Sequence, residues 1–130
     1  MKNLIILTLL LITYGCSGHE NLYMTSDDYI SVKYQQCQAL YTEDQIRERW
    51  DCTVEARNDT QKKYKNGEAD LITYLNSKGT IYVNQFYQEE LTKHEFELAM
   101  YDLSNEVGEK GQQRKMQQAQ LEGDTHERHY

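Results

Sequence analysis

The chain has 130 residues, enough for one small domain, with 14 basic and 21 acidic side chains and a net charge of −7. This acidity argues against nucleic acid as a partner, because nucleic acids attract basic surfaces. Eleven tyrosines and one tryptophan supply large apolar areas from which a core or an interface can be built.

The first segment, residues 1–15, has the pattern of a secretory signal peptide. Lys2 supplies positive charge, and a nearly uninterrupted apolar run follows from Leu4 to Ile12. This run is far shorter than the roughly 20 residues that a membrane-spanning helix needs. Its length is typical of the hydrophobic core of a secretory signal. We therefore predict that the protein is exported and that residues 1–15 are removed.

The sequence TYGC, which ends at Cys16, resembles the cleavage site of bacterial lipoproteins. The resemblance implies cleavage before Cys16 and acylation of this cysteine, so that the lipid bilayer is a partner. Ser17 then resembles the sorting signal for the outer membrane, with the protein facing the periplasm. Two or more acyl chains anchor a protein durably, and residues 16–25 are the expected tether. The alternative is an ordinary secretory signal that leaves Cys16 as a free thiol.

Cys37 and Cys52 are the two remaining cysteines. In an oxidising compartment such a pair forms a disulfide, and closing a loop of about fifteen residues is worth about 3 kcal/mol by chain entropy. A metal pair and a reactive thiol are the alternatives. The chain has no Cys-x-x-Cys sequence and no histidine near either cysteine, so we predict a structural disulfide.

The segment TSDDYISVKYQQCQALY, which starts at Thr25, has the spacing of an amphipathic helix. Four of its side chains recur at intervals of three or four residues: Ile30, Tyr34, Cys37 and Tyr41. This spacing places them on one face of a helix. Two aspartates in the first turn match the helix dipole and follow capping residues, so we predict a helix with a capped start.

The next segment predicts a second helix that runs to Tyr64. Thr42 and Gln45 have the spacing of a capping box, with Thr42 as the N-cap. The Asn-Gly pair at 66–67 is a C-cap signal. Because the two cysteines lie on either side of the turn, their bond would staple the two helices into a hairpin.

Residues 71–84 fit two different structures. Two β-rich runs flank the sequence NSKG, which suits a β-hairpin with its glycine at the bulge position. The same residues fit a short helix from Glu68 to Asn76 that is capped by Gly79 and followed by another helix from near Thr80. Val83, Phe86 and Tyr87 keep a helical spacing. An isolated hairpin is marginal without a third strand, so we favour helix here and a mainly α fold overall.

Thr92 and Glu95 form a second capping box, which predicts the start of a further helix. One apolar stripe follows along it: Phe96, Ala99, Met100, Leu103 and Val107. Such a stripe is typical of a helix face that packs into a core. The predicted helical domain therefore covers residues 26–107.

Residues 108–130 are rich in glutamine and charge and contain only two large aliphatic side chains, Met116 and Leu121. A segment of this composition buries too little apolar area to order itself. We predict a flexible C-terminal tail that is at most transiently helical.

No pattern in the sequence predicts catalysis. The chain has no Gly-rich phosphate loop, no serine or cysteine with an arranged base, and no closed set of metal-ligand spacings. His126 and His129 have helical spacing but fall in the predicted tail. We therefore expect a protein that is not an enzyme, that needs no metal or cofactor, and that has no small-molecule substrate.

The abundance of aromatic residues favours a protein that acts by binding another protein. Tyrosine and tryptophan are common in interfaces. Tyr34, Tyr41 and Trp50 lie beside the predicted disulfide and are the candidate partner-binding residues. The alternative is that many of the tyrosines fill a core in which leucine is scarce.

The combination of DDYISVKYQQCQALY and WDCTVEA in a small lipoprotein resembles plasmid entry-exclusion (surface-exclusion) lipoproteins over residues 1–56. The resemblance implies that an unidentified envelope protein of an incoming transfer machinery is the partner, and that its capture blocks redundant conjugation. Two other functions stay open. One is an accessory lipoprotein of an envelope assembly, and the other is an acidic inhibitor of a basic envelope-attacking enzyme.

Overall fold

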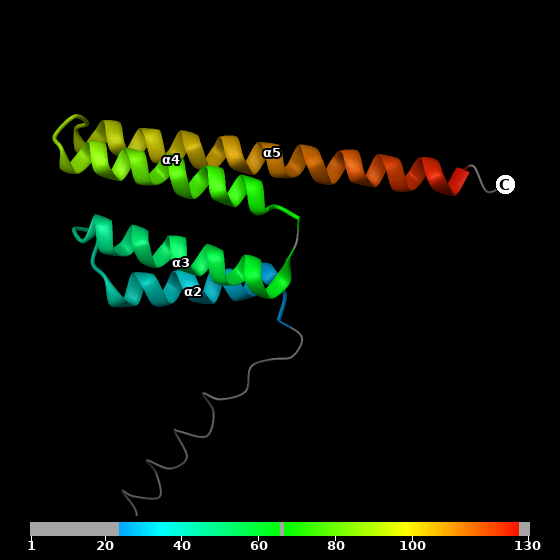
Figure 1. Cartoon of the computed structure of the whole chain (residues 1–130), viewed down its shortest axis with the longest axis horizontal. Coiled ribbons are helices and arrows are strands. Elements are labelled where there is room, and N and C mark those ends of the chain that lie inside the picture. The colour runs from blue at the N-terminus through cyan, green and yellow to red at the C-terminus, as the bar shows by residue number, and fades with distance from the viewer. Residues whose placement is uncertain (1–23, 66, 128–130) are drawn as a thin grey trace, which may run out of the picture.

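The computed structural model describes residues 24–65 and 67–127. Within these residues the fold is mainly α, as predicted, and has four helices and no strand: α2 (Ser26–Leu40), α3 (Ile46–Tyr64), α4 (Ala69–Tyr87) and α5 (Lys93–Glu127). Successive helices run antiparallel, with α2 and α3 in one layer and α4 and α5 in the other (Figure 1). Each helix packs against its neighbour in the chain. The predicted signal peptide and Cys16 lie outside the described residues.

The predicted hairpin of α2 and α3 is confirmed, and a disulfide joins its two helices. Cys37 and Cys52 are bonded, with their Cα atoms 5.7 Å apart. At the other end of the pair, the Tyr64 hydroxyl donates a hydrogen bond to the Met24 carbonyl oxygen over 2.9 Å. The ring of Tyr29 meets that of Tyr64 edge-on, so the two helices are fixed at both ends.

The start of α3 differs from the prediction. The Gln45 side chain accepts a hydrogen bond from the Thr42 backbone N–H over 3.0 Å, as a capping box requires. The Thr42 hydroxyl, however, also donates to this side chain and caps no N–H group of the helix. The helix therefore begins at Ile46 and not directly after Thr42. At the other end the left-handed C-cap is Lys65, with φ 47°, just before the predicted pair at 66–67. Gly67 of that pair also has a positive φ, of 78°.

Residues 71–84 are helical, so the β-hairpin alternative is wrong. The predicted break between two short helices is also wrong, because α4 continues through Gly79 and Thr80. α4 presents a stripe of every fourth residue to the core, and this stripe is buried: Leu71, Leu75, Gly79 and Val83. Gly79 is part of this stripe because the indole ring of Trp50 lies directly on the α4 backbone. A Cβ atom at Gly79 would overlap the Trp50 ring atoms Cη2 and Cζ2. This close approach, and not a turn, explains the glycine.

The predicted capping box at the start of α5 is confirmed. The Thr92 N–H donates to Glu95 Oε2 over 2.8 Å, and the Glu95 N–H donates to Thr92 Oγ1 over 3.2 Å. The hydrogen bond from the Thr92 backbone N–H, with a smaller contribution from the Thr92 side chain, lowers the pKa of the Glu95 carboxyl. The apolar stripe that follows faces the other helices, with Phe96 and Leu103 buried.

The core lies where α3, α4 and α5 meet. Trp50, Val83 and Phe96 form its buried centre, one from each helix. Partly buried apolar side chains surround this centre: Ile46, Val54, Tyr82, Phe86, Leu91 and Met100. The Phe86 and Phe96 ring centroids lie 5.2 Å apart, which is a favourable aromatic contact.

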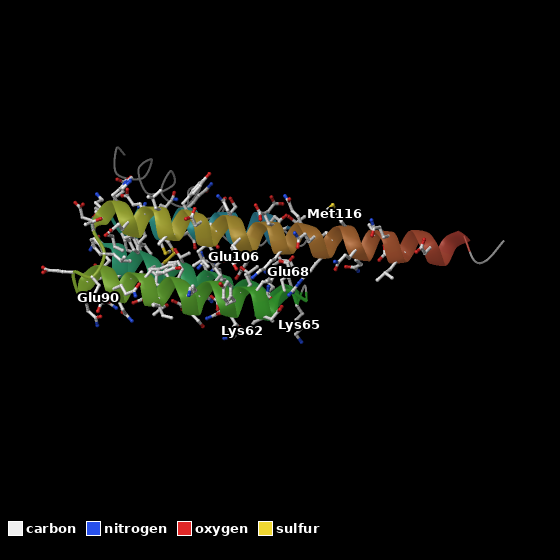
Figure 2. All side chains as sticks on the ribbon, turned by 90° about the horizontal axis from the view of Figure 1, so that it is seen from above. Lys62, Lys65, Glu68, Glu90, Glu106 and Met116 are labelled. Atoms are coloured by element: carbon white, nitrogen blue, oxygen red, sulfur yellow. A yellow bond between two sulfur atoms is a disulfide. The ribbon has the colours of Figure 1, made fainter. Side chains whose placement is uncertain are left out.

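The predicted tail differs in its secondary structure, because α5 continues without a break to Glu127. The low apolar content of this segment predicted that it would not be buried, and residues 112–124 are all exposed. A helix that is already nucleated at Thr92 needs no core to propagate, and glutamine, lysine and alanine have high helix propensity. The result is a helical extension past the start of α4 (Figure 1), on which Met116 lies (Figure 2).

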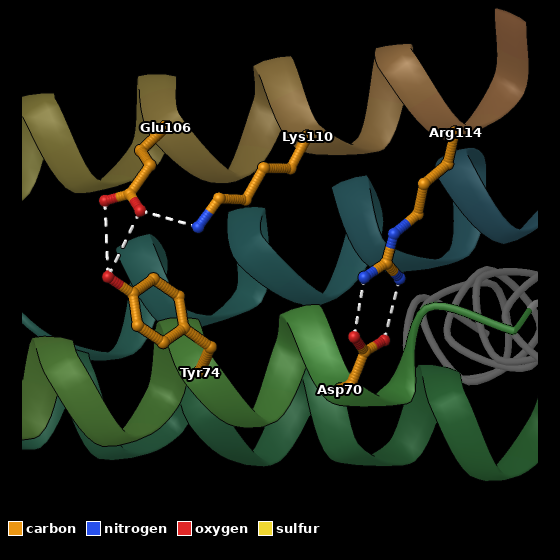
Figure 3. Close-up of polar contacts among 5 residues, drawn as sticks. All are labelled: Asp70, Tyr74, Glu106, Lys110 and Arg114. Atoms are coloured by element: carbon orange, nitrogen blue, oxygen red, sulfur yellow. Dashed lines mark hydrogen bonds and ion pairs between the residues drawn. The ribbon is translucent and has the colours of Figure 1, made fainter. Parts of the chain in front are cut away.

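Polar contacts tie α5 to α4 along its exposed side (Figure 3). The Tyr74 hydroxyl donates to Glu106, whose carboxylate also accepts from Lys110 over 2.7 Å. Farther along, Arg114 makes a two-pronged ion pair with Asp70, with distances of 2.6 and 2.8 Å. The extension leaves the bundle just beyond this pair.

The Asp70–Arg114 pair makes a prediction about pH. The Arg114 guanidinium lowers the pKa of Asp70 from 3.8 to about 2. Because the folded-state pKa is the lower one, the pair stabilises the fold fully above about pH 4, and this stabilisation is lost as pH falls through 2. In a carboxyl ¹³C NMR titration we expect the pKa of Asp70 to return toward 3.8 in Arg114→Gln. An Asp70 that titrates identically in both proteins would contradict the pair.

Candidate functional site

An open cleft of about 410 Å³ lies between the first half of α3 and the first turns of α5. Its inner wall is apolar and consists of Ile46, Trp50 and Phe96. Trp50 and Phe96 belong to the buried centre of the core, so this wall is rigid. We call this feature the α3–α5 cleft.

Arg49 also lines the cleft, beside its apolar inner wall, and its side chain is half-buried. Its Nε atom is shielded from solvent and, among the described residues, is the single side-chain atom of this kind that makes no hydrogen bond. Buried polar groups in proteins are almost always hydrogen-bonded, and an unpaired one costs free energy. The cleft therefore contains an arginine whose Nε atom is desolvated and has no acceptor in the described part of the chain.

Three further charged residues surround the cleft, and all three are exposed: Glu43, Lys93 and Glu97. Lys93 and Glu97 lie one turn apart at the start of α5, and Glu43 lies in the loop before α3. Their exposure keeps them hydrated, so they do not neutralise Arg49 as a buried partner would.

The position of Trp50 is set by a row of hydrogen bonds between α3 and α4. Each runs from a side-chain nitrogen of α3 to a side-chain oxygen of α4: Arg47 to Asn84 (3.0 Å), Trp50 to Thr80 (2.9 Å) and Arg57 to Asn76 (3.1 Å). The three acceptors recur every fourth residue, so they form one polar stripe on α4 beside its apolar stripe. This stripe fixes the register of the two helices.

Arg57 is a central residue that sequence reasoning did not single out as a site. It is buried, and its guanidinium lies 4.9 Å from the Trp50 ring. Its Nε donates to the Tyr34 hydroxyl over 2.9 Å, which links α2 to α3 and, through Asn76, to α4. In the sequence, only an arginine on the otherwise apolar face of the second helix signals this role.

The three predicted partner-binding residues do not form one surface. Trp50 is only 7% exposed and is a core residue whose edge lines the α3–α5 cleft. Tyr34 is half-buried under Arg57, and Tyr41 is the half-buried residue that caps the end of α2. Of the three, the structure places only Trp50 at the cleft.

A second cleft of about 350 Å³ lies at the opposite end of the bundle. Its lining includes Asp27 of α2 and Arg114 and Gln118 of α5. Arg114 is already paired with Asp70, so this cleft lacks the unsatisfied cation that marks the first one.

Two properties of the described residues concern other kinds of site. They contain no group of three or more side chains that could hold a metal ion. None of their helices is long and apolar enough to cross a bilayer.

Comparison with known proteins adds no relative. No protein family, no curated protein and no solved structure matches the chain.

Proposed function

We propose that this chain is an exported lipoprotein, anchored through Cys16 in the outer membrane, that acts by binding another envelope protein. The observation that carries the binding role is the α3–α5 cleft, which combines a rigid apolar wall with an arginine whose buried Nε makes no hydrogen bond among the described residues. Interfaces gain most of their binding energy where an anchor side chain enters such a preformed pocket. The lipobox-like sequence and the resemblance over residues 1–56 support the anchor and a role in conjugative exclusion.

The place of the cleft in the bundle suits a tethered binding protein. The tether joins the bundle at the start of α2, whereas the cleft lies near the starts of α3 and α5, at the other end (Figure 1). The 19 residues of α3 separate the two ends by about 28 Å at 1.5 Å per residue. An anchor at Cys16 thus leaves the cleft at the end of the domain away from the attachment point.

The anchor predicts where a variant protein is found. We expect Cys16→Ala to move the protein from the membrane fraction to the soluble fraction, because two or more acyl chains make release negligible and the variant has none. Fractionation followed by immunoblotting measures this, with Cys37→Ala/Cys52→Ala as the control that keeps Cys16. If Cys16→Ala stays with the membrane, the lipid anchor is refuted.

The exclusion role is tested in a mating assay. Recipient cells that make the full chain should accept a conjugative plasmid less often than cells that make none, and Cys16→Ala should abolish the difference. A chain truncated after Lys115 should still exclude, because it keeps the Asp70–Arg114 pair and loses only the exposed extension. Unchanged transfer against every plasmid tested would refute exclusion and favour the role of an envelope-assembly accessory.

A further inference from the structure

We propose that the α3–α5 cleft takes a short peptide segment of the partner in which a carboxylate side chain lies next to an aromatic or branched apolar side chain. This inference rests on the proposed function, because it names the chemistry of the partner that the cleft binds.

The apolar half of the segment follows from the wall of the cleft. Trp50 and Phe96 are 7% and 8% exposed, so both are held by the core and present only an edge to the cleft. Ile46 completes the wall and is half-buried. An apolar side chain that covers this wall removes the remaining ring and methyl surface from water, which favours binding. The loss of side-chain entropy is small, because the core already holds the wall in place. The cleft volume of about 410 Å³ accommodates one large side chain with its neighbours.

The acidic half follows from Arg49. Its Nε atom is already out of contact with water and makes no hydrogen bond among the described residues. A cation in this state has lost part of its hydration and gains more from a carboxylate than a fully exposed lysine does. Arginine also binds carboxylates with two parallel hydrogen bonds, which adds orientation to affinity.

The charged residues at the rim of the cleft restrict which ligands can bind there. Glu43 and Glu97 are exposed carboxylates on either side of it, and Lys93 is the single exposed cation there. Two rim carboxylates repel a strongly anionic ligand such as a polyphosphate or an acidic run. A segment with one carboxylate beside an apolar anchor satisfies Arg49 and is repelled less than a ligand with several negative charges.

The experiment is a selection from a displayed random-peptide library against the purified full chain in mild detergent. We expect the enriched peptides to share one Asp or Glu within two positions of an aromatic or branched apolar residue. Trp50 is the only tryptophan of the chain and lines the cleft, so a synthetic enriched peptide without tryptophan should change the protein fluorescence on binding.

Matched variants then test the pairing. Arg49→Gln should weaken the peptide about tenfold or more, whereas Lys62→Gln, the same charge change at the far end of α3, should leave affinity within about twofold. Replacing the Asp or Glu of the peptide by Asn or Gln should weaken its binding to the natural chain but not to Arg49→Gln. Arg49→Lys, which keeps the charge in case Arg49→Gln folds poorly, should retain part of the affinity.

Three results would overturn the proposal. They are a selection that enriches no acidic–apolar peptide, peptides that bind Arg49→Gln as well as the natural chain, and binding that leaves Trp50 fluorescence unchanged. Failure of the exclusion role is seen separately, in the mating assay. If the peptide binds through Arg49 but recipient cells show no exclusion, the binding site is supported and only the role in exclusion is refuted.

Discussion

Removing the Cys37–Cys52 disulfide is expected to lower the free energy of unfolding by about 3 kcal/mol. The two cysteines are 15 positions apart, and their bond limits the unfolded chain to closed conformations of that loop. The double variant Cys37→Ala/Cys52→Ala avoids a lone thiol and keeps an apolar side chain at Cys37, which is 3% exposed. The loss is large for a small domain, whose total stability is about 5–15 kcal/mol.

Urea denaturation followed by circular dichroism measures this loss. Adding a reductant to the natural chain should reproduce the midpoint of the double variant, and the double variant itself should not respond to the reductant. Helical content in the absence of urea should be kept, because α2 and α3 are also joined by Tyr64 and by the Arg57–Tyr34 hydrogen bond. Coincident midpoints for the oxidised natural chain and the double variant would show that the disulfide does not stabilise the fold.

The second large effect is expected from Gly79→Ala, which should destabilise the protein by about 2 kcal/mol, since overpacking a core usually costs about 1–3 kcal/mol. The new methyl group would overlap two atoms of the Trp50 indole ring. The ring cannot easily move, because its Nε1 donates to Thr80 and the Arg57 guanidinium lies over the ring, 4.9 Å from its centroid. Alanine favours a helix over glycine by about 1 kcal/mol, so a loss of stability opposes the intrinsic propensity.

Gly108→Ala is the matched control, because Gly108 is an exposed helical glycine with nothing within 4 Å of an added Cβ atom. At this position only the higher helix propensity of alanine acts, so the substitution should raise the free energy of unfolding by about 0.5–1 kcal/mol. In a Trp50→Phe background, which lacks the overlapping ring atoms, Gly79→Ala should cost less than in the natural chain. Equal effects of the two alanine variants on the urea midpoint would show that Trp50 does not press on α4.

The sequence alone determined those features that depend on residues close together in the chain. The capping box of Thr92 and Glu95 forms as predicted because both partners lie within one helical turn. The hairpin of α2 and α3 and its disulfide were predictable because helical periodicity is a local signal and because assigning Cys16 to a lipid anchor leaves Cys37 and Cys52 as one pair.

Local signals misled where a second interaction competed with them. Thr42 and Gln45 have the spacing of a capping box, but the Thr42 hydroxyl bonds to the Gln45 side chain and the helix starts later. The residues after Gly108 were assigned to a tail from their low apolar content, although helix propensity and a nucleated α5 carry the helix to Glu127. Composition predicts burial better than it predicts backbone conformation.

Only the tertiary structure decided how α3 meets α4 and α5, and therefore where the site lies. Gly79 has the sequence context of a turn, yet it is glycine because an indole ring 29 positions away in the chain lies against it. Trp50 is suited by type to a partner interface, but three helices bury it. Arg49 became a candidate only because the packing of α3 beside α5 shields its Nε and brings no acceptor to it. Such juxtapositions join distant residues, and no spacing within one helix encodes them.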